Sequence, residues 1–338
     1  MSVYAFKSFE YPTSSSGGAF PAIARALYEE VGDEFIVFGA AFNDDFSVKH
    51  FGKKYRDGIL CFQESKYVRS DISEPLEQIQ ELIRQKIPVL FVGTPCQVAA
   101  INSIIKKSGC DSDSLLTIDL ICHGTPKSEL WRGYVKLIEQ KYGKIKRVCF
   151  RNNFTRKKGR TFVELEDGRI IYDPDEMKAW MRLFSTCVSL YKGCFNCNFR
   201  NKDLNRPADI TIGDFWGVQE LIPEFKGIKD VSLVIPHTDK GQRAFDHMVS
   251  KFLNESILIK ECNDERWRVF NPHLFEQTPI PLNYDEFWNN YERYSIEEFY
   301  KKYSKASLKY KIKRGLSDMF EKMGLKYKLK YVIKHFKR

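Results

Sequence analysis

The sequence predicts an α/β protein whose core is a parallel sheet. The core is followed by an appended β-rich, cysteine-containing region and by a C-terminal helical basic tail. Apolar, strand-like runs alternate with amphipathic, helix-like runs, and a strand–helix–strand order pairs its strands in parallel. In addition, 338 residues with 43% apolar content suffice for a large core. We predict three segments: an α/β part at 1–145, a β-rich and helical part of the same unit at 146–300, and the tail at 301–338.

The first segment alternates helix-like and strand-like runs. Ser14-Ser15-Ser16-Gly17-Gly18 is typical of a helix start, and Pro75 is suited to open a second helix. Short apolar runs between the helices predict buried strands. The predicted elements are, in order, a helix at 19–30, a strand at 34–42, a helix from Pro75, a strand at 89–92, a helix at 97–107 and a strand at 115–121.

Beyond residue 144 the pattern changes from α/β to β. Strand-like runs at 146–150, 161–166 and 169–172 follow one another, and Asp167-Gly168 between the last two is a strong hairpin signal. The remaining features of this segment are the pair Cys194 and Cys197, a basic loop at 200–206 and an aromatic-rich run at 208–217.

Positive charge is concentrated near the C-terminus. The chain carries a net charge of +10, whereas Lys301 to Arg338 holds 14 Lys or Arg against Asp318 and Glu321, so residues 1–300 are nearly neutral. A nucleic-acid-binding domain has its basic patch among the folded elements. We therefore predict no nucleic-acid partner.

The tail is amphipathic, because apolar residues recur in it at intervals of three or four, which predicts one or two helices. Two interpretations stay open. The tail packs on its own domain with a solvated lysine face, or it binds an acidic partner or the anionic inner face of a membrane. The apolar positions are Leu308, Ile312, Leu316, Met319, Met323, Tyr327, Tyr331, Val332, Ile333 and Phe336.

The sequence shows neither a signal peptide nor a membrane-spanning run. Residues 1–10 lack a basic start followed by an apolar run, and no apolar stretch reaches about 18 residues. Nine cysteines, an odd number, argue against a disulfide framework and for reduced thiols. We predict a cytoplasmic protein, which is peripheral at the membrane if the tail binds lipid.

Four cysteines are candidate ligands of a soft metal or an iron–sulfur cluster: Cys96, Cys122, Cys194 and Cys197. Cys96 and Cys122 each follow a predicted parallel strand, and the carboxyl ends of such strands share one edge of a sheet. Three alternatives stay open: zinc in a non-redox scaffold that binds a partner, inert buried thiols, and a thiol enzyme with Cys96 as nucleophile and His123 as its base.

Six motifs taken together resemble the coenzyme F420 hydrogenase/dehydrogenase beta-subunit family, from about Ser14 to about Gly241. The resemblance implies a flavin and iron–sulfur oxidoreductase that passes electrons between clusters and a hydride acceptor, and bacterial relatives occur among polysaccharide-biosynthesis proteins. The motifs are Ser-Ser-Gly-Gly at 15–18, Ser65-Lys66-Tyr67, Gly93-Thr94-Pro95-Cys96-Gln97, the run from Asp119 to Pro126, Cys194-x-x-Cys197 and Asp209-Ile-Thr-Ile-Gly-Asp-Phe-Trp-Gly217.

The resemblance implies the cofactors and partners. The four cysteines would hold one [4Fe-4S] cluster, for which Cys187 is a substitute ligand, and the flavin would be FAD or FMN. The hydride acceptor would be a small molecule, either F420-like or a cell-envelope or polysaccharide precursor. Many bacterial relatives begin with a ferredoxin-like, cysteine-rich segment, and this chain has no cysteine before Cys61, so we expect a separate ferredoxin-like electron donor or acceptor.

The other site residues are predicted around the flavin. Residues 15–18 are either an ordinary helix cap or a cradle for the flavin pyrophosphate. Lys66 is a charge for the flavin or an ordinary exposed lysine, and His123 is a proton shuttle or a structural histidine. The family motif usually has Gly where this chain has Glu64. The predicted catalytic residues are His123 and Lys66, and the predicted cofactor-binding residues are Ser15, Ser16, Gly17, Gly18, Lys66, Thr94, Gln97 and Asp214.

Overall fold

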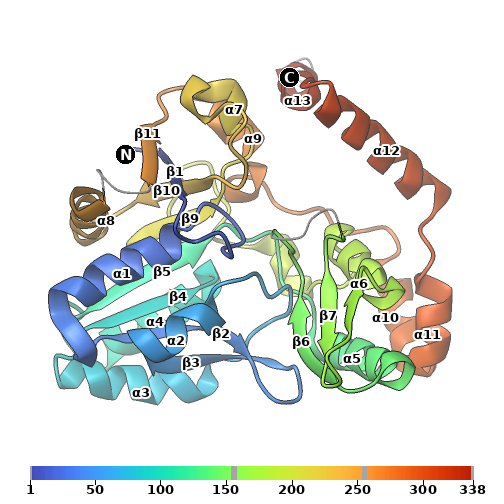
Figure 1. Cartoon of the computed structure of the whole chain (residues 1–338), viewed down its shortest axis with the longest axis horizontal. Helices are drawn as coiled ribbons and strands as arrows, with labels where there is room; N and C mark the ends of the chain where they lie inside the picture. Colours follow the sequence, from blue (N-terminus) through green and yellow to red (C-terminus); the bar gives the residue numbers. More distant parts are fainter. Residues whose placement is uncertain (1, 154–157, 253–256, 336–338) are drawn as a thin grey trace.

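In residues 2–153, 158–252 and 257–335, which the computed structural model describes, the chain forms one sheet of eight strands and one of three (Figure 1). The strands are β1 Tyr4–Ser8, β2 Ile36–Phe42, β3 Val48–Lys54, β4 Val89–Gly93, β5 Leu115–Leu120, β6 Ile145–Cys149, β7 Phe162–Leu165, β8 Ile170–Tyr172, β9 Ile210–Asp214, β10 Ser232–Pro236 and β11 Ile257–Glu261. The helices are α1 Ala19–Val31, α2 Tyr55–Phe62, α3 Ser73–Arg84, α4 Pro95–Lys107, α5 Ser128–Tyr142, α6 Asp175–Ser185, α7 Val218–Leu221, α8 Asp239–Phe252, α9 Arg266–Phe270, α10 Tyr284–Arg293, α11 Ile296–Tyr303, α12 Leu308–Lys322 and α13 Lys326–His335.

The large sheet has the strand order β11-β1-β10-β9-β5-β4-β2-β3. Its central strands β9, β5, β4 and β2 pair in parallel, which confirms the predicted parallel core. Antiparallel strands extend the sheet on both sides, with β3 beyond β2 and with β10, β1 and β11 beyond β9. The sheet is therefore mixed at its edges and parallel at its centre.

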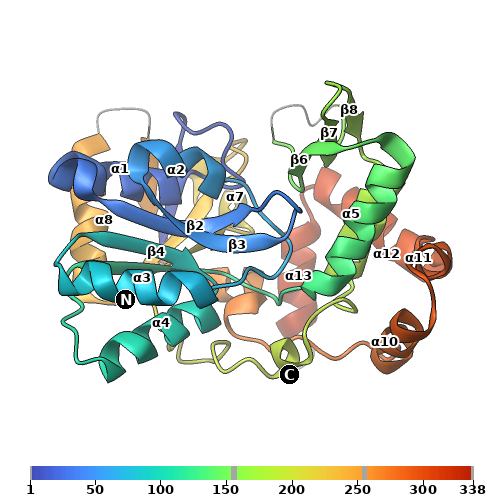
Figure 2. The same cartoon turned by 90° about the horizontal axis from the view of Figure 1, so that it is seen from below.

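Helices cover both faces of the large sheet. α1, α2 and α8 lie on one face, and α3 and α4 lie on the other (Figure 2). Alternate residues of β4 are buried on opposite faces of the sheet. Leu90 and Val92 belong to the hydrophobic core under α1, α2 and α8, and Val89 and Phe91 belong to the core under α3 and α4. Burial on both faces explains why this strand is a continuous apolar run in the sequence.

A second body is built mainly from the chain between β5 and β9. After β5 the chain forms α5, the antiparallel sheet β6-β7-β8 and α6, and it returns to the large sheet at β9. α10 and α11 pack on this body, whose aromatic core includes the buried side chains of Trp131, Trp180 and Phe287. The predicted segment 146–300 thus contributes to both bodies, and the division into three domains stays a prediction.

Most predicted elements agree with the structure to within two residues. α4 begins at Pro95, two residues before its predicted start, because Thr94 and Gln97 form a capping box around it. The strand predicted at 34–42 begins at Ile36, since Gly32–Glu34 form a short 3-10 helix. Elements that the sequence analysis did not identify include β1, β3, α5, α6, α8, β10 and β11.

The tail forms α12 and α13, as its apolar spacing predicted. α13 packs on α9, where the rings of Tyr327 and Phe270 lie 5.2 Å apart, and Lys334 forms an ion pair with Glu276. Phe336, which was assigned to the same apolar pattern, lies outside the described residues. Among the helices of the described residues, none combines the length and the apolar character needed to cross a membrane.

α12 is arranged differently from α13. In Figure 1 it runs from the end of α11 to α13. Its apolar residues Ile312, Leu316, Met319 and Met323 have relative exposures of 55%, 48%, 45% and 51%. Of the two interpretations of the tail, docking on its own domain therefore describes α13, whereas α12 keeps an exposed apolar row.

Candidate functional site

Cys96 is positioned by the cap of α4. The Thr94 N–H donates to Gln97 Oε1 over 2.9 Å, and this capping box starts the helix directly after β4. Cys96 is the second residue of α4, is exposed, and has its Sγ 3.1 Å from the hydroxyl oxygen of Thr94. The side chain lies at a helix N-terminus, where the backbone dipoles favour negative charge.

Cys122 lies just beyond the end of β5, the parallel neighbour of β4. Gly93, the last residue of β4, pairs with Asp119 of β5, so Cys96 and Cys122 follow strands that end at the same edge of the sheet. The N–H of Gly124 donates to Cys122 Sγ over 3.3 Å. This edge is formed by the carboxyl ends of the strands, the usual place for ligands in an open α/β sheet.

The thiol of Cys122 lies within electrostatic reach of two other thiols, those of Cys96 and Cys194. Burial raises the pKa of the Cys122 thiol to about 12, the Gly124 N–H and the guanidinium of Arg200 oppose that rise, and the thiols of Cys96 and Cys194 add to it. Cys194 Sγ is 3.9 Å from the hydroxyl oxygen of Thr125.

Cys194 and Cys197 come from a short 3-10 helix, Lys192–Asn196, and the residue after it. The side chain of Gln277 holds the backbone of Cys197 from both sides: its Oε1 accepts from the Cys197 N–H over 2.9 Å, and its Nε2 donates to the Cys197 carbonyl over 2.8 Å. We call Cys96, Cys122, Cys194 and Cys197 the site cysteines. Among the described residues, no group of His, Cys, Asp and Glu side chains is arranged to hold a metal ion, and the ligand role of the site cysteines stays a prediction.

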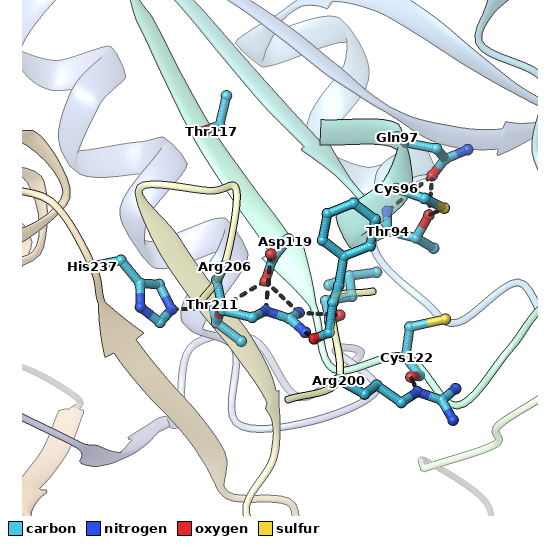
Figure 3. A network of polar contacts seen from close by, with 12 residues as sticks. Thr94, Cys96, Gln97, Thr117, Asp119, Cys122, Arg200, Arg206, Thr211 and His237 are labelled. Atoms are coloured by element: carbon cyan, nitrogen blue, oxygen red, sulfur yellow. Dashed lines mark hydrogen bonds and ion pairs between the residues drawn. The ribbon is translucent and has the colours of Figure 1, made fainter. Parts of the chain in front are cut away.

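A buried ion pair ties the Cys197 loop to β5. Arg206 donates to the two carboxylate oxygens of Asp119 over 2.7 and 3.1 Å, and both side chains are at most 1% exposed (Figure 3). Burial raises the pKa of the Asp119 carboxyl, and the charge of Arg206 opposes that rise. Arg206 also donates to the backbone carbonyls of Leu120 and Phe199, so one guanidinium connects the strand end to the loop.

A cavity of about 310 Å³ lies next to Cys122 at the same edge of the sheet. Three of its lining residues have a buried side-chain atom that finds no partner within the described residues: Ser14 Oγ, His50 Nδ1 and Gln63 Nε2. Leaving buried polar atoms unpaired is costly, and most buried polar atoms in proteins have a partner. Three such atoms around one cavity indicate a polar ligand, and they fit the hydrogen-bonding groups of a flavin.

The predicted flavin and catalytic residues are concentrated around this cavity, but their polar groups are not equally available. The Gln97 amide is fully used by the protein, since its Oε1 accepts twice from Thr94 and its Nε2 donates to the Ser70 carbonyl and hydroxyl. Asp214 accepts from Arg151 over 2.7 Å. The predicted residues that line the cavity are Ser15, Ser16, Gly18, Lys66, Thr94, Gln97, His123 and Asp214, whereas Gly17 is not in its wall.

The serine–glycine stretch is held by the sheet. Gly18 precedes α1 with a φ of 83° and no side-chain cap, so the serines do not act as an ordinary cap. The Gly17 N–H donates to Ser232 Oγ over 2.8 Å, and a Cβ at Gly17 would lie 2.2 Å from the Phe6 carbonyl oxygen. Glycine is therefore required at both positions by the backbone, and substitutions there test folding before they test ligand binding.

Lys66 is a cation in the cavity wall. Its Nζ donates to the carbonyl oxygens of Cys61 and Gln63 over 2.7 and 2.5 Å, which uses two of the three donors of an ammonium group in the described structure. Burial lowers the pKa of Lys66 to about 8. Glu64, two residues earlier, has a φ of 63°, the left-handed region that favours the Gly of the family motif.

His123 lines the cavity beside Cys122. Its Nε2 lies 3.4 Å from the Phe184 carbonyl oxygen, and its ring packs against the Phe184 ring with centroids 4.3 Å apart. Burial lowers its pKa to about 4, so the ring is neutral near pH 7. Within the described structure the contacts of Cys96 and His123 are with other residues, and nothing couples the two as nucleophile and base.

Three residues of this region were not predicted from the sequence: His50, Arg151 and Arg200. His50 is 2% exposed in β3, its Nε2 lies 2.9 Å from the Val92 carbonyl oxygen, and burial lowers its pKa to about 4. The alternation of buried Val48 and His50 in β3 was the available signal. No local signal marks the two arginines, because an arginine in a basic or polar loop is ordinarily exposed.

Comparison with known proteins decides the family. The family model for the C terminus of the coenzyme F420 hydrogenase/dehydrogenase beta subunit matches residues 88–259, which is just over half of the chain. The chain belongs to this family. The match includes the four site cysteines, whereas the motifs at 15–18 and 65–67 lie before it.

A structural match agrees with the family in fold. A chain of the F420-reducing [NiFe] hydrogenase complex from Methanosarcina barkeri aligns with a TM-score of 0.50 and 20% sequence identity, over 77% of this chain and 81% of that chain. No curated protein sequence matches this chain significantly. Family membership assigns an oxidoreductase role, because the F420 hydrogenase/dehydrogenase beta subunits are parts of oxidoreductases.

Proposed function

We propose that the protein passes electrons between a separate ferredoxin-like partner and a small-molecule hydride acceptor, through one [4Fe-4S] cluster and one flavin. The observation that carries this proposal is the juxtaposition of thiols and cavity: Cys122 lines the cavity and lies within electrostatic reach of Cys96 and Cys194. The donor set of the cluster site is thiolate sulfur, which suits iron–sulfur ligation.

The chain would hold each group with its own residues. The site cysteines would hold the cluster, and the cavity would hold the flavin. When bound, the flavin supplies hydride transfer and the cluster supplies single-electron transfer. Lys66 would bind an anionic part of the flavin through its remaining N–H, Gln63 Nε2 would donate a hydrogen bond, and the neutral His50 would accept one at Nδ1. The acceptor is an F420-like coenzyme or a cell-envelope precursor.

Flavin binding is testable at Lys66. Replacing Lys66 by methionine removes the charge but keeps an unbranched side chain, and we expect the affinity for FAD or FMN to fall about tenfold or more, because hydrogen bonds to charged groups contribute about 1.5–3 kcal/mol. Fluorescence titration of the purified protein with each flavin measures this. Lys54→Met, which alters an exposed lysine, is the matched control. Wild-type protein that binds neither flavin contradicts the flavin assignment.

The second part of the proposal is that α12 attaches the protein to an anionic membrane surface. Its exposed apolar row lies in a tail with a balance of +12, and Lys311 and Arg314 are exposed beside that row. A helix with a basic face and an exposed apolar row lies in the headgroup region of a bilayer. Such an attachment would place the oxidoreductase close to envelope precursors.

Membrane binding is testable without removing the tail. The full chain is expected to co-sediment with phosphatidylserine-containing vesicles, less so at high salt, because screening weakens charge attraction. The double variant Leu316→Gln/Met319→Gln keeps good helix formers and removes apolar area, so its bound fraction should fall about tenfold or more. Leu282→Gln, at a fully exposed leucine outside the tail, controls for loss of apolar surface. Equal binding of the double variant and the wild type contradicts the attachment.

A further inference from the structure

Arg200 is a buried cation without a carboxylate partner in the described residues. It is 4% exposed. Its Nε donates to the Cys122 carbonyl over 3.2 Å, and its Nη1 donates to the Thr278 hydroxyl. These partners are neutral, so they accept from the guanidinium without balancing its charge.

Two neighbouring arginines of the same region are neutralised. Arg206 is paired with Asp119, and Arg151 is paired with Asp214 over 2.7 Å and with Asp230 over 3.4 Å. A buried, uncompensated charge is strongly unfavourable in a folded protein, whereas a buried pair is tolerated. The fold therefore holds Arg200 at a place where negative charge is expected from another source.

The site cysteines, as thiolate ligands of the proposed cluster, would be that source. Arg200 lies three residues after Cys197, and its guanidinium is fixed beside Cys122, as Figure 3 shows. The Thr278 hydroxyl that accepts from Arg200 donates in turn to the His123 carbonyl over 3.2 Å. The guanidinium is thus anchored from two segments, and its position next to Cys122 does not depend on a mobile surface side chain.

We infer that Arg200 is the counter-charge of the iron–sulfur centre and sets its reduction potential; this inference rests on the proposed function. A centre ligated by four thiolates is negatively charged, and reduction adds one further negative charge. A fixed positive charge in a poorly solvated site stabilises the more negative, reduced state, since charge and hydrogen bonds near the cluster tune its potential. Arg200 therefore raises the potential at which the centre accepts an electron. It is a positioning and tuning residue, not a catalytic one.

The test compares three variants with the wild-type full chain after anaerobic purification. Iron and sulfide analysis gives cluster content, and a redox titration followed by electron paramagnetic resonance gives the potential. Arg200→Gln is expected to shift the potential to a more negative value, and Arg200→Lys, which keeps the charge, is expected to stay close to the wild type. Lys202→Gln removes the same charge from an exposed position two residues away and should leave the potential unchanged, because water screens it.

The outcomes separate this inference from the proposed function. Wild-type protein without iron and sulfide overturns both. A cluster-containing Arg200→Gln variant with the wild-type potential overturns only the role of Arg200. If Arg200→Gln does not fold or does not load, Arg200→Lys decides: a loaded centre with the wild-type potential supports the role of the charge, and a loss of loading or a potential clearly different from that of the wild type overturns it.

Discussion

Serine in place of any one of the four site cysteines is expected to deprive the anaerobically purified protein of most of its iron and sulfide. A hydroxyl is a hard, weakly acidic group and a poor substitute for a thiolate on iron, so the loss should occur only where sulfur is a ligand. Iron, sulfide and zinc analysis measures the effect, and paramagnetic resonance of the reduced sample identifies the centre.

The chain offers matched controls for this series. Cys61 is exposed and donates to the Gly58 carbonyl, and Cys110 lies shortly after the end of α4, so Cys61→Ser and Cys110→Ser should retain full iron. Cys187 is partly buried, and burial raises the pKa of its thiol. Cys187→Ser tests whether this residue is a substitute ligand. Stoichiometric zinc without sulfide in the wild type would instead favour the non-redox scaffold.

The largest expected effect on stability is at Asp119. Replacing Asp119 by asparagine leaves the guanidinium of Arg206 buried without its counter-charge, and we expect the free energy of unfolding to fall by about 3–5 kcal/mol, the usual range for breaking a buried ion pair. Urea denaturation measures the change. The same variant should also lower iron content, since Arg206 connects β5 to the Cys197 loop.

Two further variants control this prediction. Asp167→Asn breaks an exposed pair with Arg169 and should change stability far less. Replacing Asp119 by leucine together with Arg206 by methionine removes both charges, so it should recover part of the stability lost in Asp119→Asn. An Asp119→Asn protein as stable as the Asp167→Asn protein contradicts the importance of the buried pair.

Local signals predicted the parts of the fold that depend on neighbouring residues. The apolar runs of β2, β4 and β5 and the helices α3 and α4 were identified because periodicity and breakers are local, whereas α2 was not identified. The capping box of Thr94 and Gln97 was readable too, and it would have placed the start of α4 at Pro95. The tail helices followed from spacing alone.

Features that depend on distant contacts were not predictable. Ser16 and Gly17 resemble a helix start, yet Ser16 donates to Val231 and Gly17 to Ser232, more than 200 residues away in the chain. Arg200 lies in a basic stretch that predicts a solvated loop, and only the tertiary structure shows that it is buried. His50 was missed because β3 has few strongly apolar residues, so its alternation is a weak signal in the sequence.

The parallel pairing of β5 with β9 has a consequence for how this chain can vary. Ile118 pairs with Ile210, so about 90 residues that build most of the second body leave and re-enter the large sheet at neighbouring strands. The entropy of closing such a chain segment grows only logarithmically with its length, and doubling it costs about 0.6 kcal/mol. Insertions and deletions between these strands therefore hardly affect the closure of the large sheet. Length differences among homologous chains should be concentrated there, while the spacing between Cys96 and Cys122, set by one helix and one strand, should stay nearly constant.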